Sequence, residues 1–329
     1  MAGRFAPRAP RGGAAGVPRQ GGGPGLVREL VPGGPVDLAL VLGVLRRGPG
    51  DPSFRFTPDG AVWRAARTPL GPGTLRVTAR AALGTVRGEA WGPGASWLLE
   101  RLPGLVGLED DPSVFVARHE LLRVTARRVP GLRLTRTGLV LESLIPSVLE
   151  QKVTADEAYR GWRRLLQAFG EPAPGPAPEG MRVMPHPRAW ALIPSWEWHR
   201  AGVDDKRAAT ILRAVRVFER MEEAAGMAPE AARARLEVLP GIGPWTSAEV
   251  VQRSHGAADA VTTGDLHLPG IVGHALADDR DADDAEMLRL LEPYAESGQR
   301  HRAARLVLLS RRFPARRAPR MRKGDISVW

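Results

Sequence analysis

The chain of 329 residues contains no cysteine, which excludes disulfides, thiol nucleophiles, iron–sulfur clusters and zinc sites with cysteine ligands. Aromatic residues make up only 5% of it. Lysine is almost absent as well, because Lys152, Lys206 and Lys323 are the only lysines among 47 basic residues. The seven histidines show none of the spacings typical of a metal site, so we expect no metal held by side chains.

Long hydrophobic runs are also missing. No segment approaches the roughly eighteen apolar residues that a membrane span needs, and the first residues lack the apolar stretch of a signal peptide. At 43% hydrophobic residues, the chain is nevertheless long enough to bury a large core. We therefore expect a cytoplasmic protein, and we expect it to be a monomer.

Positive charge gathers at the two ends of the chain. The net charge is +11, of which residues 1–28 contribute +5 and residues 297–323 contribute +10, so the remainder carries 11 − 15 = −4. Residues 1–34 are rich in Gly, Pro, Ala and Arg and predict a disordered tail, and residues 313–329 predict a second, basic tail. Such tails would add salt-sensitive, sequence-independent affinity for nucleic acid, but they say little about the core.

Between these tails the hydrophobic pattern changes once. Residues 35–111 predict a small antiparallel sheet domain, with strands at 54–56, 61–67, 74–81 and 85–91 and helices at 36–45 and 96–102. Residues 112–312 have amphipathic helical periodicity. The helices expected there are 139–151, with Thr154 capping 155–169, then 187–192, 195–200, 205–224, 229–238, 245–255, 284–292 and 299–312. The predicted fold class is mainly α with a small N-terminal α+β domain.

The most specific motif lies at residues 239–246, which read Leu-Pro-Gly-Ile-Gly-Pro-Trp-Thr. Gly241 and Gly243 permit a tight turn, and Pro244 occupies the favoured first position of the next helix. Free backbone N–H groups at such a helix start bind anions, here a DNA phosphate. The motif therefore predicts a helix-hairpin-helix over about 229–255 that grips DNA through Gly241, Gly243 and Thr246. The alternative is an ordinary pair of helices joined by a glycine turn.

Twenty residues after Trp245 lies Asp265, in Val-Thr-Thr-Gly-Asp-Leu-His-Leu-Pro. With this hairpin and this spacing, the chain resembles the helix-hairpin-helix DNA glycosylases over residues 36–312, and most of all the alkylpurine enzymes of the 3-methyladenine DNA glycosylase II type. The resemblance implies a bundle of helices around the hairpin, with Asp265 as the catalytic carboxylate. A carboxylate there stabilises the positive charge that develops on deoxyribose as the glycosidic bond breaks. The alternative for Asp265 is a turn residue, and His267 is a further candidate for proton transfer.

The same resemblance assigns the residues around a flipped base. Relatives that also cut the DNA strand carry a Schiff-base lysine where this chain has Trp245. The resemblance therefore implies a monofunctional glycosylase, which releases the base without cutting the strand. Trp245 would instead stack on the base, and the alternative is a tryptophan at a helix start that packs in the core. Glu249 is either a hydrogen-bond acceptor in the pocket or a solvated helix residue. The positions that match the family's base pocket are Val44, Trp245, Glu249, Leu266 and Ser310, and few of them are aromatic.

Other positions match the family's contacts with the duplex. The loop at Gln151 and Lys152 corresponds to the segment that fills the gap left by a flipped base, and Lys152 either fills it or contacts a phosphate. Arg302, together with Arg300 and Arg305, is a candidate phosphate contact. The family also implies a monovalent cation on the hairpin carbonyls of Leu239 and Ile242, and no other cofactor.

The sequence therefore predicts a DNA glycosylase of base excision repair whose partner is double-stranded DNA containing a damaged base. The expected lesion is an alkylated purine such as 3-methyladenine or 7-methylguanine. Two alternatives stay open. One is a non-catalytic helix-hairpin-helix protein that binds damaged or distorted DNA, and the other is an RNA-associated factor that relies on its arginine-rich ends.

Overall fold

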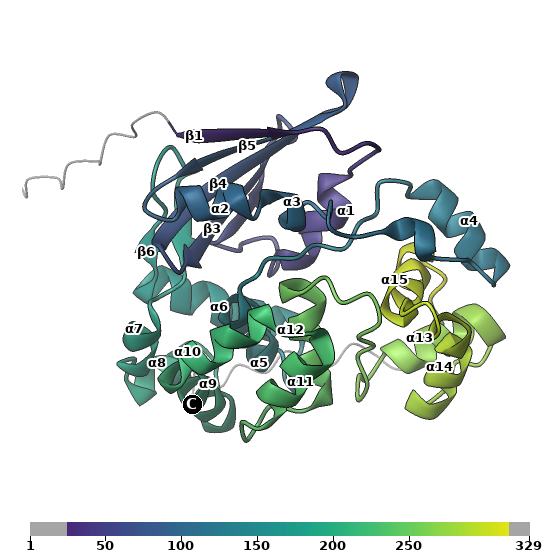
Figure 1. The fold of residues 1–329 in the computed structure, drawn as a ribbon. Helices are drawn as coiled ribbons and strands as arrows, with labels where there is room; N and C mark the ends of the chain where they lie inside the picture. Colours follow the sequence, from purple (N-terminus) through teal and green to yellow (C-terminus); the bar gives the residue numbers. More distant parts are fainter. Residues whose placement is uncertain (1–24, 316–329) are drawn as a thin grey trace, which may run out of the picture.

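The computed structural model describes residues 25–315 and begins with a five-stranded antiparallel sheet (Figure 1). Its spatial order is β1-β5-β4-β3-β2, so the first strand lies at one edge beside the last. The strands are β1 (Leu26–Leu30), β2 (Phe54–Phe56), β3 (Val62–Thr68), β4 (Gly71–Arg80) and β5 (Thr85–Trp91). Three short helices, α1 (Leu38–Leu42), α2 (Ala95–Glu100) and α3 (Leu102–Leu105), belong to the same region.

The rest of the described chain is helical, apart from the small two-stranded pair of β6 (Glu171–Pro172) and β7 (Arg182–Val183). Its first helices are α4 (Glu120–Arg128), α5 (Val140–Leu149), α6 (Ala155–Phe169), α7 (Pro187–Ala191), α8 (Ser195–Arg200), α9 (Asp205–Arg216) and α10 (Phe218–Glu222). They are followed by α11 (Pro229–Glu237), α12 (Pro244–Ser254), α13 (Leu268–Ala277), α14 (Asp284–Leu291) and α15 (Arg300–Ser310).

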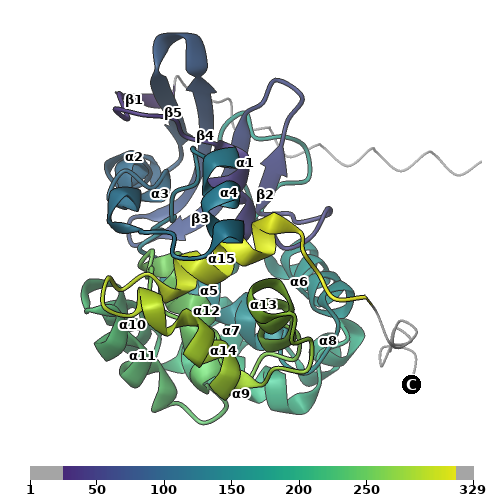
Figure 2. The same cartoon turned by 90° about the vertical axis from the view of Figure 1, so that its right-hand side faces the viewer.

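The helical region has two hydrophobic cores rather than one. The larger core joins α5 to α12, with Trp162, Trp190 and Trp198 buried in it. A second core joins α4 to α13, α14 and α15 around Met287 and Tyr294. A third core lies between the sheet and helices α1 to α3. In Figures 1 and 2 the sheet stands above the larger helical group, and in Figure 1 α13–α15 form a group at the right of it.

Local chemistry explains the helix starts that matter most here. Thr154 caps α6 through a capping box with Glu157, as its sequence pattern predicts, and the helix has the predicted bounds. The start of α5 is buried, and the Glu222 carboxylate accepts hydrogen bonds from the N–H groups of Val140 and Leu141 at 2.9 and 2.8 Å. That helix therefore begins on a buried carboxyl group, whose pKa burial raises above its ordinary value, and carries the Gln151 loop at its other end.

Two expectations need correction. Residues 26–30 were expected in the N-terminal tail, but they form β1 and pair in register with β5; residues 1–24 lie outside the described part. No helix was expected at residues 268–277, which form α13. Of the predicted basic tail, residues 316–329 also lie outside the described part. Within residues 25–315, no helix has the length and apolar character required to cross a lipid bilayer.

Candidate active site

A cavity of about 340 Å³ lies where the sheet domain meets both helical groups. Its size falls within the roughly 300–1,000 Å³ typical of ligand pockets. Helix α1 supplies one wall, α12 and the loop after it supply a second, and α13 and α15 close it. The lining residues are Leu40, Val41, Val44, Arg133, Leu134, Thr135, Glu249, Gln252, Arg253, Thr262, Asp265, His267, Leu268, Ile271, His301, Ala304, Arg305 and Leu308.

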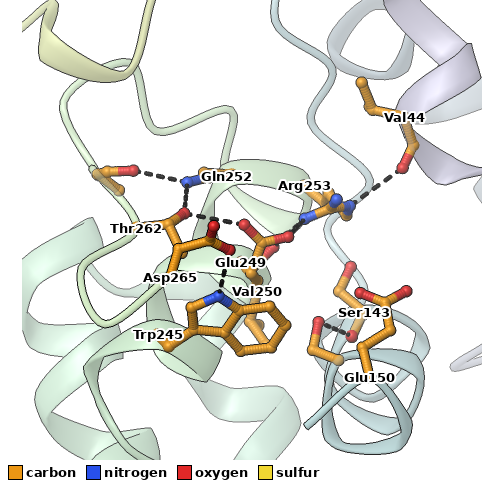
Figure 3. Close-up of polar contacts among 12 residues, drawn as sticks. Val44, Ser143, Glu150, Trp245, Glu249, Val250, Gln252, Arg253, Thr262 and Asp265 are labelled. Carbon is orange, nitrogen blue, oxygen red and sulfur yellow. Dashed lines mark hydrogen bonds and ion pairs between the residues drawn. The ribbon is translucent and has the colours of Figure 1, made fainter. Parts of the chain in front are cut away.

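Asp265 is held at the cavity by three hydrogen bonds. Its Oδ1 accepts from the backbone N–H groups of His267 and Leu268, both at 2.8 Å, at the start of α13. Its Oδ2 accepts from the indole N–H of Trp245 at 3.0 Å (Figure 3). Donors on both oxygens, two of them backbone N–H groups at a helix N-terminus, fix the direction of the carboxyl group. The carboxylate is thus positioned to stabilise a positive charge formed in the cavity.

Glu249 stands one helical turn after Trp245 and is fully hydrogen-bonded. Its Oε2 pairs with Arg253 at 2.7 Å, and its Oε1 accepts from the Thr262 hydroxyl at 2.8 Å. Thr262 in turn accepts from Gln252 at 2.8 Å (Figure 3). Burial alone raises the pKa of Glu249, but the Arg253 charge and the Thr262 hydroxyl outweigh burial and hold that pKa below its usual value. Glu249 is therefore a fixed carboxylate in the cavity wall.

Helix α15 adds His301 and Arg305, which are four residues apart and share one face of the helix. Desolvation lowers the pKa of His301 to about 3, and the Arg305 charge adds to this lowering, so the imidazole is neutral at pH 7. Desolvation and the Arg253 charge lower the pKa of Arg305 to about 10, so this guanidinium is protonated at pH 7. Its Nη2 donates to the carbonyl of Leu40 at 3.3 Å.

The hairpin turn lies between α11 and α12, as predicted. Gly241 adopts φ +98°, and a Cβ at that position would overlap the Thr210 hydroxyl. At Gly243, the N-cap of α12, a Cβ would meet nothing within 4 Å. The Gln151 amide donates to the carbonyl of Gly241 at 2.9 Å and to the Thr246 hydroxyl at 2.8 Å. The loop after α5 and the hairpin are thereby joined.

The structure brings together some of the predicted pocket residues and not others. Val44, Glu249 and Asp265 line the cavity, and so does His267. Leu266 does not, since its side chain is 84% exposed. Ser310 does not line the cavity either, because the face of α15 turned toward the cavity carries Leu308. The Ser310 hydroxyl instead donates to the carbonyl of Val307 in its own helix. Those two assignments are wrong.

Trp245 contacts the site in another way than predicted. Trp245 is not among the residues that line the cavity, although its indole N–H donates to Asp265 at the edge of the cavity. A stacking platform on a base inside the cavity is therefore not what this arrangement provides. The half-buried indole acts through its N–H group.

Of the residues predicted to contact DNA, some are buried and one, Lys152, is exposed. Arg302 is only 2% exposed and pairs with Asp110 beneath the surface, so a phosphate contact by this residue is wrong. Thr246 is also 2% exposed, and its hydroxyl is engaged by Gln151. Lys152 is exposed and adopts φ +55°, an uncommon conformation for a residue other than glycine. Lys152 therefore stays a candidate contact.

Sequence reasoning missed most of the polar cavity wall. Arg253 lies at i+4 from Glu249, a spacing that also occurs on solvated helix faces. Arg305 was considered only as a phosphate contact, and His301 was not considered. The available signal was the i, i+4 spacing of His301 and Arg305, but nothing in the sequence shows which face of α15 is turned inward.

Comparison with known proteins bears on the fold of the chain. No protein-family profile matches the chain. Two Mycobacterium tuberculosis proteins, each described as a "Probable bifunctional transcriptional activator/DNA repair enzyme AlkA", are 31% identical over 179 residues. The match covers 50% of this chain and 34% of each relative, so the chain spans about a third of the length of these curated relatives.

Solved structures resemble almost the whole described chain. A 3-methyladenine DNA-glycosylase from Archaeoglobus fulgidus superposes with a TM-score of 0.69 at 17% identity, covering 86% of this chain and 98% of that one. The apo form of an 8-oxoguanine glycosylase/lyase from Clostridium acetobutylicum superposes with a TM-score of 0.64 at 12% identity, covering 84% and 93%. At these identities the likeness shows a shared fold.

Proposed function

We propose that this chain, whose fold is that of the helix-hairpin-helix DNA glycosylases, hydrolyses the N-glycosidic bond of a damaged base flipped out of duplex DNA. The observation that carries the proposal is the placement of Asp265. Its carboxylate lies at the edge of a base-sized cavity and accepts hydrogen bonds from Trp245, His267 and Leu268.

The chemistry requires little else from the protein. As the bond between C1′ and the base nitrogen breaks, positive charge develops on the sugar, and an ionised carboxylate nearby lowers the energy of that transition state. A water molecule then adds its oxygen to C1′, and its proton is released. Asp265 is fixed by its three donors, so it does not reorganise during the reaction.

The hairpin supplies the proposed grip on the duplex. The N-terminus of α12 follows Gly243, where the open space permits close approach of a phosphate to the backbone. We include a monovalent cation on the carbonyls of Leu239 and Ile242. Backbone oxygens are suitable ligands for such an ion, and the turn is tight, with the Ile242 N–H donating to the Leu239 carbonyl at 3.0 Å. When bound, the ion would add positive charge next to the phosphate.

We include the absence of strand cleavage in the proposal. The indole of Trp245 forms no imine, and it is hydrogen-bonded to Asp265. Borohydride treatment of the protein with damaged duplex should therefore trap no covalent adduct. An adduct formed by the unmodified protein would overturn this part of the proposal.

For the lesion, the sequence prediction of an alkylated purine has the support of one similar structure described as a 3-methyladenine DNA-glycosylase. Another similar structure is described as an 8-oxoguanine glycosylase/lyase, so likeness alone does not choose between lesions. The residues of the cavity itself are the better guide, and they are considered in the next subsection.

The decisive experiment is single-turnover base release from duplexes carrying 7-methylguanine, hypoxanthine or 1,N6-ethenoadenine. The unmodified protein is compared with Asp265→Asn, which keeps the size of the side chain and removes its charge. We expect base release that falls by at least about 10²-fold in the variant. Tight binding to damaged duplex with no release from any of them would instead favour the non-catalytic DNA-binding alternative.

A further inference from the structure

The cavity carries more positive than negative charge. Three arginines line it, Arg133, Arg253 and Arg305, against the two carboxylates Glu249 and Asp265. Before the histidines are counted, the sum is therefore +3 − 2 = +1. His301 is neutral at pH 7 and does not change this sum.

The arginines differ in how far their charge is already balanced. Arg253 is paired with Glu249 at 2.7 Å and also donates to the carbonyl of Val44 at 3.1 Å. Arg305 and Arg133 have no carboxylate within ion-pair distance among residues 25–315. Arg305 makes one hydrogen bond, to the carbonyl of Leu40, out of the five that a guanidinium can donate. A half-buried, protonated guanidinium with spare donors therefore borders the cavity.

Charge bears directly on which base fits. A 3-methylated adenine or 7-methylated guanine in DNA is a cation, and an uncompensated arginine repels it. The aromatic faces that favour a cationic ring are also missing from the cavity lining. A neutral base with a carbonyl oxygen instead offers an acceptor that the guanidinium can reach.

The way in which the base leaves the sugar also favours a neutral base. A cationic base leaves as a neutral molecule and needs no help with its charge. A neutral base leaves with the electron pair of the broken C1′–N bond, and that negative charge spreads onto its carbonyl oxygen. A guanidinium donating to this oxygen stabilises the departing base, as oxyanion donors do elsewhere. Water supplies the new C1′–OH, and its proton restores an N–H on the base.

We propose that the cavity selects a neutral base bearing a ring carbonyl oxygen, such as hypoxanthine, and that Arg305 donates to that oxygen as the base departs. This inference rests on the proposed glycosylase function and narrows its substrate class. It assigns Arg305 a direct contact with the leaving group. The carboxylate of Asp265 then acts on the sugar side of the bond and Arg305 on the base side.

The test compares three duplexes that separate charge from the oxygen acceptor. Hypoxanthine is neutral with a carbonyl oxygen, 1,N6-ethenoadenine is neutral without one, and 7-methylguanine is cationic. Each single-turnover rate is divided by the rate of base loss from the same duplex without protein, because a cationic base leaves faster on its own. We expect the largest acceleration for hypoxanthine.

Arg305→Met keeps the length of the side chain and removes its donors. It should lower the acceleration for hypoxanthine by on the order of 10²–10³-fold, while 7-methylguanine is unaffected or released faster. Arg305→Lys keeps the charge and should restore part of the hypoxanthine rate. Arg289→Met, which removes an exposed arginine on α14, is the control for lost attraction to DNA.

The ratio of rates on two duplexes is measured with one preparation, so partial misfolding of a variant does not affect it. Release of 7-methylguanine with the greater acceleration, or an equal loss on all duplexes in Arg305→Met, would overturn the inference and leave the glycosylase function intact. No release from any duplex by the unmodified protein would remove the glycosylase function, and the inference with it.

Discussion

The indole Nε1 of Trp245 donates to Oδ2 of Asp265 at 3.0 Å, across twenty residues of sequence. Trp245 therefore orients the carboxylate through a hydrogen bond, whereas its position in the sequence had predicted that it stacks on the base. The other carboxylate oxygen is occupied by backbone donors at the start of α13. Trp245 is therefore the one side chain that orients Asp265 from the hairpin.

Trp245→Phe tests this relationship, because it removes the N–H group and keeps an aromatic face. A hydrogen bond to a charged group is worth about 1.5–3 kcal/mol, so we expect the single-turnover rate to fall by about 10- to 100-fold. Binding of damaged duplex, measured by anisotropy, should be unchanged. Trp196→Phe, at an indole that is 64% exposed, is the matched control. Full activity in Trp245→Phe would favour stacking over orientation.

The two glycines of the hairpin should respond differently to alanine. Gly241→Ala meets both a positive φ and the Thr210 hydroxyl, so it should destabilise the fold by more than about 1 kcal/mol. Gly243→Ala has open space around its Cβ, so it should fold normally and weaken duplex binding. Urea denaturation and DNA binding of both variants separate the effects. Equal stability losses would contradict this distinction.

The ion pair of Glu249 and Arg253 is mostly shielded, with each side chain 15% exposed. Arg253→Met leaves the Glu249 carboxylate without its main partner and should lower the free energy of unfolding by about 3–5 kcal/mol. Arg289→Met breaks an exposed pair at i,i+3 spacing and should leave the urea midpoint almost unchanged, because solvent screens such a pair. A similar urea midpoint for both variants would show that burial is not the deciding factor.

His301 should make stability depend on pH. Its pKa is about 3 in the folded chain against an ordinary 6.5, so the unfolded state binds a proton that the folded state does not. Stability is therefore lost as pH falls below 6.5 and continues to fall toward 3. His301→Asn should flatten the dependence by up to about 1.4 kcal/mol per pH unit between pH 6 and 4. The measurement is the urea midpoint at several pH values, and identical slopes would contradict a neutral His301.

Local patterns predicted the elements that depend on local interactions. The capping box fixed the bounds of α6, and the hairpin motif fixed the turn before α12. Helix α13 was missed because Gly270 and Gly273 lower helical propensity. In the fold these glycines allow close contact: a Cβ on Gly270 would lie 2.7 Å from the carbonyl of Arg280, and one on Gly273 would overlap that of Asp279.

The features that the sequence did not predict depend on contacts between residues far apart in the chain. Strand β1 is recognisable only by its partner β5, which lies about sixty residues later. Asp265 was predicted because its position after the hairpin matches the aspartate of the glycosylase family that the sequence resembles. Arg305 was not recognised as a cavity residue, because its position there depends on how α15 packs against α4 and α13, which a single sequence does not record.

The cavity wall at residues 38–45 joins the N-terminal sheet region to the helical region through hydrogen bonds to its backbone carbonyls. Arg305 donates to the carbonyl of Leu40 in α1, and Arg253 donates to that of Val44 in the 3₁₀ turn Gly43–Leu45 that follows α1, so both arginines are anchored by main-chain atoms of this segment. Substitutions at Leu40, Val41 and Val44 therefore change the shape of the cavity while leaving these anchors in place. If the proposed function holds, this segment is a place where evolution could alter the range of accepted bases without any change to Asp265.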